Sequence, residues 1–153
     1  DYPPHRMDAI FAKLRDSVIF SALDAASGFW QINIKEGDRH KTAFRTESGV
    51  YEFLVMPFGL KNAPATFSRW MTESFTGLRQ MMQVYIDDIL VHSKSLSKHH
   101  EHLRKMFHTC QANGIKLRLS KCEFLKEEVK MLGFVVNKKG IAKNHDKVDA
   151  ILK

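Results

Sequence analysis

The chain has 153 residues, a length that suits one domain with a hydrophobic core and is too short for two full-sized domains. Hydrophobic residues make up 44% of the sequence and charged residues 27%, which excludes wholesale disorder, and no apolar run approaches the roughly 18 residues of a membrane span. The two cysteines form no CxxC pair, so we expect a reducing, intracellular setting. Because the chain starts with neither Met nor a signal-peptide pattern, we expect a segment of a longer protein.

The formal net charge of +7 is distributed unevenly along the chain. Residues 1–93 contain 10 Lys and Arg against 11 Asp and Glu, whereas residues 94–153 contain 14 against 6. A basic segment of this kind suits a polyanionic partner such as nucleic acid, although a solvated basic surface is the commoner cause of such asymmetry. Charge alone therefore leaves both interpretations open.

Hydrophobic spacing and turn residues predict five elements in the first part of the chain. Met7, Ile10 and Leu14 recur at helical spacing, whereas residues 18–24 form an apolar run that ends in Asp24 and predicts a buried strand. The predicted elements are a short helix at 7–14, strands at 18–24 and 31–35, a hairpin at 41–56 and a loop at 57–62.

The second part is predicted to contain two amphipathic helices and further strands. Pro64 fits the first turn of one helix, while Ser97 and Gly114 fit the N-cap and the C-terminal end of the other. Asp87-Asp88 interrupts an apolar stretch, which predicts two strands joined by a turn at the two aspartates. The predicted elements are a helix from about 63 to 77, the strand pair at 82–91, a helix at 97–113, strands at 115–119 and 129–136, and a turn at 137–140.

Without the central hairpin, the predicted order is strand, helix, two strands, helix, strand. This is the order of the α+β, ferredoxin-like split βαβ fold. Right-handed crossovers leave room between the first two strands for the third, which runs antiparallel beside the first. The end of the first strand therefore lies beside the turn between the second and third, so we expect Asp24, Asp87 and Asp88 to meet at one edge of the sheet.

Each aspartate also has an ordinary structural interpretation. Two aspartates in a hairpin turn are common, and an aspartate such as Asp24 after a strand often caps a helix. Three converging carboxylates would repel one another and raise their pKa values unless cations neutralised them. Oxygen ligands without His or Cys suit Mg²⁺ or Mn²⁺, and two such ions about 4 Å apart are a common device for nucleotidyl transfer. Convergence would therefore favour a metal-dependent enzyme.

Two short motifs surround the predicted aspartates: Leu23-Asp24 followed by residues 27–32, and Tyr85-Ile86-Asp87-Asp88. They resemble the first catalytic motif and the YxDD motif of the reverse transcriptases of Ty3/gypsy-type long-terminal-repeat retrotransposons. Further blocks lie in the same order along nearly the whole chain, at residues 41–46, 51–53, 56–67, 119–124 and 132–134. The resemblance implies the palm and part of the fingers of an RNA-directed DNA polymerase from a Pol polyprotein, with a fingers hairpin inserted at about residues 31–62.

The resemblance also implies a catalytic metal site. Asp24, Asp87 and Asp88 would be the catalytic residues and would bind two Mg²⁺ ions, with Mn²⁺ as an alternative, and Asp88 would be the least tightly engaged of the three. The backbone of Ala25 would contribute to the metal site. The N–H groups of Ala25 and Ala26 would bind phosphate oxygens of the incoming nucleotide.

Three further residues would form the nucleotide pocket. Phe29 would pack against the sugar and exclude a ribose 2′-hydroxyl, while Phe58 and Gly59 would line the space for the nucleotide and the template base. Without the resemblance, Phe29 is explained as well by a place in the core, and Phe58 by a role as a hydrophobic plug on the following helix. Both interpretations stay open at the level of the sequence.

The resemblance places the primer near Tyr85 and near a turn formed by Leu132, Gly133 and Phe134, where glycine allows a backbone to approach closely. Lys121 is a candidate proton donor to the pyrophosphate leaving group, although a lysine at a strand edge is more often only solvated. The implied partners are an RNA or DNA template with its primer, deoxynucleoside triphosphates, and the thumb and ribonuclease H segments of the parent polyprotein. We expect no membrane partner and a location in the cytoplasm or in a virus-like particle.

Residues 1–153 show no counterpart of the thumb or ribonuclease H region, so we expect this segment alone to bind primer and template weakly. An RNA-recognition module of similar fold should show a Lys-Gly-Phe-Gly-Phe-Val strand, and a nucleotidyl cyclase a Gly-Gly-acidic-acidic-Phe turn, and the sequence contains neither. A domesticated or decayed element that binds nucleic acid without catalysis stays open as the alternative.

Histidines gather on the predicted second helix, at His99, His100, His102 and His108. They lack the i, i+4 spacing of a zinc-binding helix, so we expect them to form an exposed helix face. Trp30 and Trp70 are most simply explained as core residues.

Overall fold

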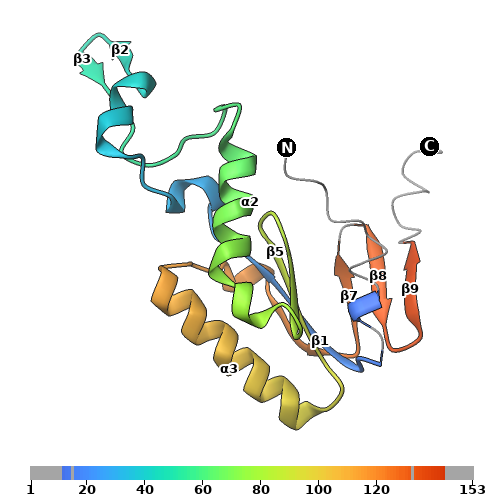
Figure 1. The fold of residues 1–153 in the computed structure, drawn as a ribbon. Coiled ribbons are helices and arrows are strands. Elements are labelled where there is room, and N and C mark those ends of the chain that lie inside the picture. The colour runs from blue at the N-terminus through green and yellow to red at the C-terminus, as the bar shows by residue number, and fades with distance from the viewer. Residues whose placement is uncertain (1–11, 15, 132, 144–153) are drawn as a thin grey trace, which may run out of the picture.

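The computed structural model describes residues 12–14, 16–131 and 133–143. Helices α2 (Ala63–Ser74) and α3 (Leu96–Asn113) cover one face of a central sheet, a second sheet packs on the other face, and an arm extends away from both (Figure 1). The helix predicted at 7–14 falls mostly outside the described residues. Within these described ranges, no helix has the length and hydrophobicity needed to cross a membrane.

The central sheet has the strand order β4-β5-β1-β6, formed by Met82–Tyr85, Asp88–Ser93, Ile19–Asp24 and Glu123–Lys126. All three neighbouring pairs are antiparallel. α2 lies between β1 and β4 in the chain and α3 lies between β5 and β6, and β5 lies beside β1 in the sheet. This arrangement confirms the predicted α+β fold with split βαβ topology.

The alternation of side chains along β5 separates two hydrophobic clusters. Ile89 and Val91 pack toward the helices, together with Phe67 of α2 and Met106 of α3, in what we call the helical cluster. Leu90, between them in sequence, belongs to a second cluster with residues of the small sheet. Because neighbouring residues of a strand point to opposite faces, β5 is buried on both sides. Full burial of each such side chain contributes roughly 1.5–3 kcal/mol to stability.

The strand predicted at 115–119 is wrong. Leu117 pairs with Ala25 in one isolated bridge, and a 3-10 turn, η4 (Leu119–Lys121), follows before β6 begins. Ile115 is buried and Leu117 packs against the helical cluster. The alternating pattern therefore predicted correctly that one side of this segment is buried. An extended loop, however, gives the same pattern as a strand.

The strand predicted at 129–136 is also wrong, because the chain reverses within it. The second sheet consists of β7 (Glu128–Met131), β8 (Phe134–Asn137) and β9 (Gly140–Lys143), antiparallel and in that order. Gly133 lies at the first reversal with a φ of 78°, a backbone angle that favours glycine. The predicted turn at 137–140 is confirmed, since Asn137 pairs with Gly140.

The predicted hairpin is confirmed but shorter, and it forms the tip of the arm (Figure 1). The segment at 31–35 that was expected to be a strand pairs only through an isolated bridge between Asn33 and Val55. The arm consists of η1 (Gly28–Gln31), η2 (Glu36–Thr42), β2 (Phe44–Thr46) and β3 (Gly49–Tyr51). η2 shortens the hairpin because it occupies the start of the first predicted strand.

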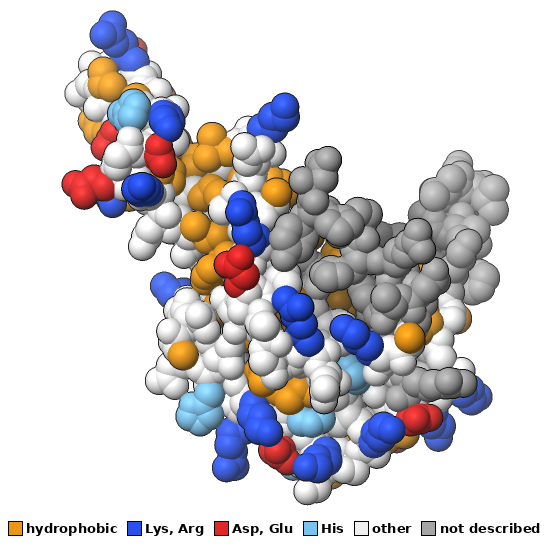
Figure 2. Space-filling model, viewed as in Figure 1, with side chains coloured by type: hydrophobic (Ala, Val, Ile, Leu, Met, Phe, Trp, Pro, Cys, Tyr) orange, Lys and Arg blue, Asp and Glu red, His pale blue; other side chains and the backbone are white. Residues whose placement is uncertain are grey.

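Aromatic rings make a continuous series of contacts from α2 to the tip of the arm. Neighbouring ring centroids are between 5.2 and 6.4 Å apart. From α2 outward the rings are Phe67, Phe29, Phe58, Trp30, Phe53, Phe44 and Tyr51. Trp30 is 47% exposed, so its predicted place in the core is wrong, whereas Trp70 packs against the helical cluster. Figure 2 shows hydrophobic side chains on the surface where the arm meets α2.

The helix ends follow the predictions except at the N-cap of α3 and at the end of α2, which lies at Ser74 rather than near Gly77, because a separate 3-10 turn, η3 (Thr76–Leu78), follows. α2 has Pro64 in its first turn, and α3 ends at Gly114 with a φ of 69°, both as predicted. Ser95, not Ser97, is the N-cap of α3, and its Oγ accepts a hydrogen bond from the N–H of Lys98 at 3.3 Å. Two serines so close together fit the capping pattern equally well, and only the backbone path distinguishes them.

Candidate metal and nucleotide site

The ends of β1 and β5 bring the three predicted aspartates to one edge of the sheet. Asp24 lies directly opposite Asp88 in the antiparallel pair, and the N–H of Ala25 donates a hydrogen bond to the carbonyl of Asp87 at 2.9 Å. Directly opposed residues have Cβ atoms about 4.5–5.5 Å apart. The predicted meeting of the aspartates is confirmed. In the part of the chain that the structure describes, however, no three His, Cys, Asp or Glu side chains form a group that could hold a metal ion.

The turn between β4 and β5 differs by one residue from the prediction. Tyr85 pairs with Asp88, so the two-residue loop is Ile86-Asp87 rather than Asp87-Asp88. Ile86 has a φ of 56°, a left-handed conformation that costs a β-branched residue on the order of 1–3 kcal/mol. Its side chain packs against the helical cluster, which holds this conformation in place. Asp87 consequently lies exposed at the turn and Asp88 begins β5.

A pocket of about 150 Å³ opens beside this turn. Asp24 and Asp87 both line the pocket, whereas Asp88 does not. The other lining residues are Ala25, Ser27, Gly28, Phe29, Phe58, Phe67, Ile86, Arg118 and Lys121. The pocket therefore combines carboxylates, two basic side chains and aromatic rings.

The three aspartates differ in how far nearby basic side chains offset their negative charges. The pKa of Asp88 is raised, first by partial burial and then by the negative charges of Asp87 and Asp24, while Lys121 acts in the opposite direction. Arg118 lies close to Asp24, with 3.7 Å between Nε and Oδ1. The aspartates thus repel one another in a way that a bound cation would relieve. Sequence reasoning missed Arg118, because its place beside Asp24 follows from the irregular pairing after β1.

The aromatic wall of the pocket is formed around Phe29. Its ring centroid lies 5.2 Å from that of Phe58 and 5.7 Å from that of Phe67. Phe29 packs against the helical cluster on one side and lines the pocket on the other, so its ring is not enclosed in the core. Phe58 is 63% exposed, which disagrees with the alternative of a hydrophobic plug. Gly59 follows with a φ of 92° and does not line the pocket.

The N–H groups of Ala25 and Ala26, implied as phosphate contacts by the resemblance, are both engaged within the protein. Ala25 donates to the carbonyl of Asp87, and Ala26 donates to the carbonyl of Lys116 at 2.8 Å. These bonds hold the end of β1 against its neighbours. Ser27, the next residue, has a left-handed φ of 53° and lines the pocket.

The residues predicted to contact a primer are found on the side of the small sheet. Tyr85 packs against the hydrophobic cluster that includes residues of β7 and β8. Gly133 lies in the turn between these strands and Phe134 begins β8, while Leu132 lies outside the described residues. Lys121, the candidate proton donor, is exposed and lines the pocket with the aspartates.

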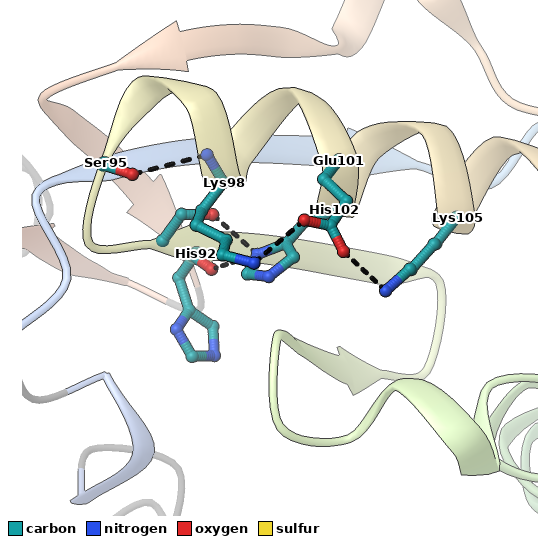
Figure 3. A network of polar contacts seen from close by, with 7 residues as sticks. His92, Ser95, Lys98, Glu101, His102 and Lys105 are labelled. Atoms are coloured by element: carbon teal, nitrogen blue, oxygen red, sulfur yellow. Dashed lines mark hydrogen bonds and ion pairs between the residues drawn. The ribbon is translucent and has the colours of Figure 1, made fainter.

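A buried histidine cluster lies at the opposite end of β1 and β5. The predicted exposed position is wrong for His99, which is fully buried and has its two ring nitrogens 2.7 Å from Ser21 Oγ and 2.8 Å from Ser93 Oγ. His102 is half-buried, with Nδ1 2.8 Å from the same Ser93 Oγ and 3.2 Å from the carbonyl of His92 (Figure 3). Burial, with a smaller contribution from neighbouring histidines, lowers the pKa of His99 to about 4.

The outer face of α3 is charged, and two histidines lie on it as predicted. Glu101 accepts hydrogen bonds from Lys98 at 3.0 Å and from Lys105 at 2.7 Å (Figure 3). These two lysines lower the pKa of Glu101 to about 2. His100 and His108 are exposed. The helix thus presents polar groups to solvent while His99 faces the sheet.

Comparison with known proteins agrees with this architecture. A sequence model of the family described as reverse transcriptase (RNA-dependent DNA polymerase) matches residues 2–136. The chain is 45% identical over 152 residues to the "Retrovirus-related Pol polyprotein from transposon 297" of Drosophila melanogaster, and 36% identical over 152 residues to the "Transposon Tf2-3 polyprotein" of Schizosaccharomyces pombe. Each match covers 99% of this chain but only 14% and 11% of those polyproteins, respectively.

Solved structures of foamy viral protease-reverse transcriptase share the fold. One, in complex with double-stranded DNA, has a TM-score of 0.86 and 27% identity and covers 97% of this chain and 26% of that one. Another, in complex with an RNA/DNA hybrid, has a TM-score of 0.85 and 26% identity and covers 99% of this chain and 20% of that one. With the family model matching most of its length, the chain belongs to the reverse transcriptase family.

Proposed function

We propose that this chain forms the catalytic palm of an RNA-directed DNA polymerase, which transfers a deoxynucleoside monophosphate from its triphosphate to the 3′-hydroxyl of a primer. The observation that carries the proposal is the register of β1 and β5, which sets Asp24 opposite Asp88, with Asp24 and Asp87 in the same pocket as Phe29. The family match supports the same class of reaction.

The residues of this edge fit divalent cations by their chemistry. Carboxylates of Asp24 and Asp87 line the pocket, and neither His nor Cys is among its lining residues, which suits Mg²⁺ or Mn²⁺. Asp88 would be a further, weaker ligand, and the backbone of Ala25 another. When bound, two such cations stabilise the charge that develops on the reacting oxygens. Because the side chains do not form a closed site by themselves, we infer that the carboxylates turn toward each other when cations bind.

The rest of the pocket would hold and orient the nucleotide. Phe29 would pack against the sugar and occupy the space that a 2′-hydroxyl needs, while Phe58 would border the nucleotide. Lys121 would donate a proton to the pyrophosphate leaving group from the same pocket. Since the N–H groups of Ala25 and Ala26 are engaged, phosphate oxygens would instead meet the backbone at Ser27 and Gly28, which line the pocket.

We propose nucleic acid, an RNA or DNA template with its primer, as the partner of this chain. The primer would approach Tyr85 and the turn between β7 and β8, next to the basic C-terminal part of the sequence. Thumb and ribonuclease H segments of a parent Pol polyprotein would strengthen this contact. We therefore expect slow, distributive synthesis from this chain alone.

Primer extension tests the proposal. The chain, alone and fused to the region that follows the matched segment in the transposon 297 polyprotein, is mixed in excess with labelled oligo(dT) on poly(rA), dTTP and Mg²⁺. We expect Mg²⁺-dependent addition, and a loss of at least about 100-fold in Asp87→Asn, because its carboxylate would act on charge that develops in the transition state. Asp38→Asn, an aspartate on the arm that pairs with Lys41, is the matched control and should retain activity.

Two outcomes would count against the proposal. Unchanged incorporation by Asp87→Asn would show that the aspartates have another role. Binding of primer and template without any incorporation, in both forms of the protein, would favour a decayed or domesticated element that binds nucleic acid without catalysis.

A further inference from the structure

Gln31 connects two segments at the edge of the candidate site through its side-chain amide. Nε2 donates hydrogen bonds to the carbonyl oxygens of Ala26 and of Lys116, the latter at 3.0 Å. Oε1 accepts a hydrogen bond from the N–H of Lys116 at 2.8 Å. One carboxamide thus satisfies three backbone groups, and it joins segments 85 residues apart in sequence.

A few backbone contacts also join these two segments, among them a hydrogen bond from the N–H of Arg118 to the carbonyl of Asp24 at 2.9 Å. Past the end of β1, their pairing is a single bridge between Ala25 and Leu117 rather than a strand. The carbonyl of Lys116 accepts hydrogen bonds both from the N–H of Ala26 at 2.8 Å and from Gln31. The three bonds of Gln31 add to the two backbone bonds between these segments, and they are the ones that reach the loop carrying Phe29.

The connection holds both ends of the loop from Ala26 to Gln31, which carries Phe29 and follows the strand that ends at Asp24. Asp24 lies two residues before Ala26, and Phe29 lies two residues before Gln31 in η1. Asp24 and Phe29 line the pocket, whereas Gln31 does not. Attaching both Ala26 and Gln31 to Lys116 therefore restrains the backbone that connects Asp24 to Phe29.

We propose that Gln31 is a positioning residue, whose side-chain amide sets the metal-binding edge at Asp24 and the sugar-selecting ring of Phe29 at their working separation. The inference rests on the proposed function, since it concerns the same site. Glutamine suits the role because its amide offers two N–H donors and an acceptor on one planar group. Glutamate would turn an oxygen toward two carbonyls, and leucine would keep the bulk but make none of the bonds.

Hydrogen exchange and Mn²⁺ binding test the inference on the chain itself. For Gln31→Leu we expect the amides of Ala26 and Lys116 to exchange faster, and Mn²⁺ to bind more weakly, each by about tenfold, because the variant lacks the hydrogen bonds of the amide. Ser95→Ala is the control, since it removes the cap of α3 at the other end of the sheet and costs about 1 kcal/mol. At matched stability it should leave both quantities unchanged.

Sugar selectivity separates positioning from general structural support. In primer extension, Gln31→Leu should lower the preference for deoxynucleotides over ribonucleotides by about tenfold, as expected when Phe29 is displaced, whereas Ser95→Ala should not. Should Gln31→Leu fail to fold, the same measurements are made on Gln31→Glu, which keeps the size and the acceptor of the side chain but lacks its N–H donors. We expect the same weaker Mn²⁺ binding and lower sugar preference.

The outcomes distinguish this inference from the proposed function. Folded Gln31 variants with unchanged Mn²⁺ affinity and unchanged sugar preference would overturn the positioning role and leave the proposed function intact. An unsubstituted chain that binds no Mn²⁺ and incorporates no nucleotide would overturn the proposed function, and the positioning role with it.

Discussion

Asp87 and Asp88 are neighbours in sequence but occupy different surroundings. Asp87 is exposed at the turn and lines the pocket, whereas Asp88 is half-buried at the start of β5. Burial and the charges of Asp87 and Asp24 raise the pKa of Asp88 and so disfavour its charged form. Asp87, whose side chain lines the pocket, would therefore be more accessible to a cation there than Asp88.

Phe29 can be tested through the sugar that the pocket accepts. Phe29→Val removes most of the ring and opens the space that a 2′-hydroxyl needs, so ribonucleotide incorporation relative to deoxynucleotide should rise at least about tenfold. Single-nucleotide incorporation with each substrate measures the ratio. Phe53→Val changes another ring of the same aromatic series outside the pocket and should leave the ratio unaltered. An unaltered ratio in Phe29→Val would remove Phe29 from this role.

At the scale of single elements, the start of α3 offers a matched pair of substitutions. Ser95 caps the helix by accepting the N–H of Lys98, whereas Ser97 lies inside the helix and is exposed. Ser95→Ala should lower the free energy of unfolding by about 1 kcal/mol, and Ser97→Ala should change it by less than about 0.5 kcal/mol. Urea denaturation measures both. Equal effects of the two substitutions would contradict the assigned cap.

His99 is expected to make the stability of the protein depend on pH, because it is buried between α3 and the sheet. The structure keeps this ring close to Ser21 of β1 and Ser93 of β5, and Ser21 Oγ also accepts the N–H of Leu125 in β6 at 3.1 Å. The pKa of His99 falls from 6.5 to about 4 in the fold, so the unfolded chain binds the additional proton between these values.

Unfolding in urea at a series of pH values tests this dependence. The free energy of unfolding should be unaffected by His99 above pH 6.5 and should decrease as the pH falls toward 4, by roughly 3 kcal/mol at most for this residue. His99→Gln should reduce the slope, while His108→Gln, an exposed position on the same helix, should leave it as it is. A slope that His99→Gln does not change would assign the pH dependence to other groups.

At the scale of the whole molecule, exposed lysines continue along the small sheet beyond the turn where the primer is proposed to approach. Figure 2 shows Lys and Arg side chains over the lower part of the molecule, and the turn between β8 and β9 carries the exposed Lys138 and Lys139. Each lysine that neutralises a phosphate releases counterions, so affinity should fall steeply with salt.

Charge reversal in this turn tests whether bound nucleic acid extends along the small sheet, from the turn between β7 and β8 to the turn between β8 and β9. Lys138→Glu with Lys139→Glu should weaken binding to a primer and template at low salt, and should lower the slope of log affinity against log salt by about 1 for each phosphate that is no longer neutralised. Fluorescence anisotropy over a range of salt concentrations gives the slope. Lys41→Glu on the arm is the control, because Lys41 already pairs with Asp38. An unchanged slope in the double variant would place the nucleic acid elsewhere.

The order of elements and the meeting of the aspartates could be predicted because both depend on local or general rules. Helical spacing, turn residues and the handedness of crossovers were enough to set Asp24 beside Asp88. The same rules failed where a hydrophobic pattern is compatible with two different structures. Alternation at 115–119 fits a loop as well as a strand, and the apolar run at 129–136 continues on both sides of the reversal at Gly133.

The remaining errors concern contacts between segments distant in sequence. His99 looked like part of an exposed face because its serine partners come from two strands, one of them 78 residues away. Arg118 and Gln31 were overlooked for the same reason, since each contacts the end of β1 or the loop after it from a place that no periodicity marks. Side-chain partners of this kind become visible only when the backbone path is known.

The aromatic series that runs from α2 to the arm gives the protein an internal optical probe. Trp30 stands within that series, 6.1 Å from the ring of Phe58 at the pocket and 47% exposed, and the sequence contains one other tryptophan, Trp70. Replacing Trp70 by Phe would leave a single indole, half-exposed beside the pocket, whose emission should shift when its exposure to water changes. Arrival of a nucleotide could then be followed by intrinsic fluorescence, in real time and without a label.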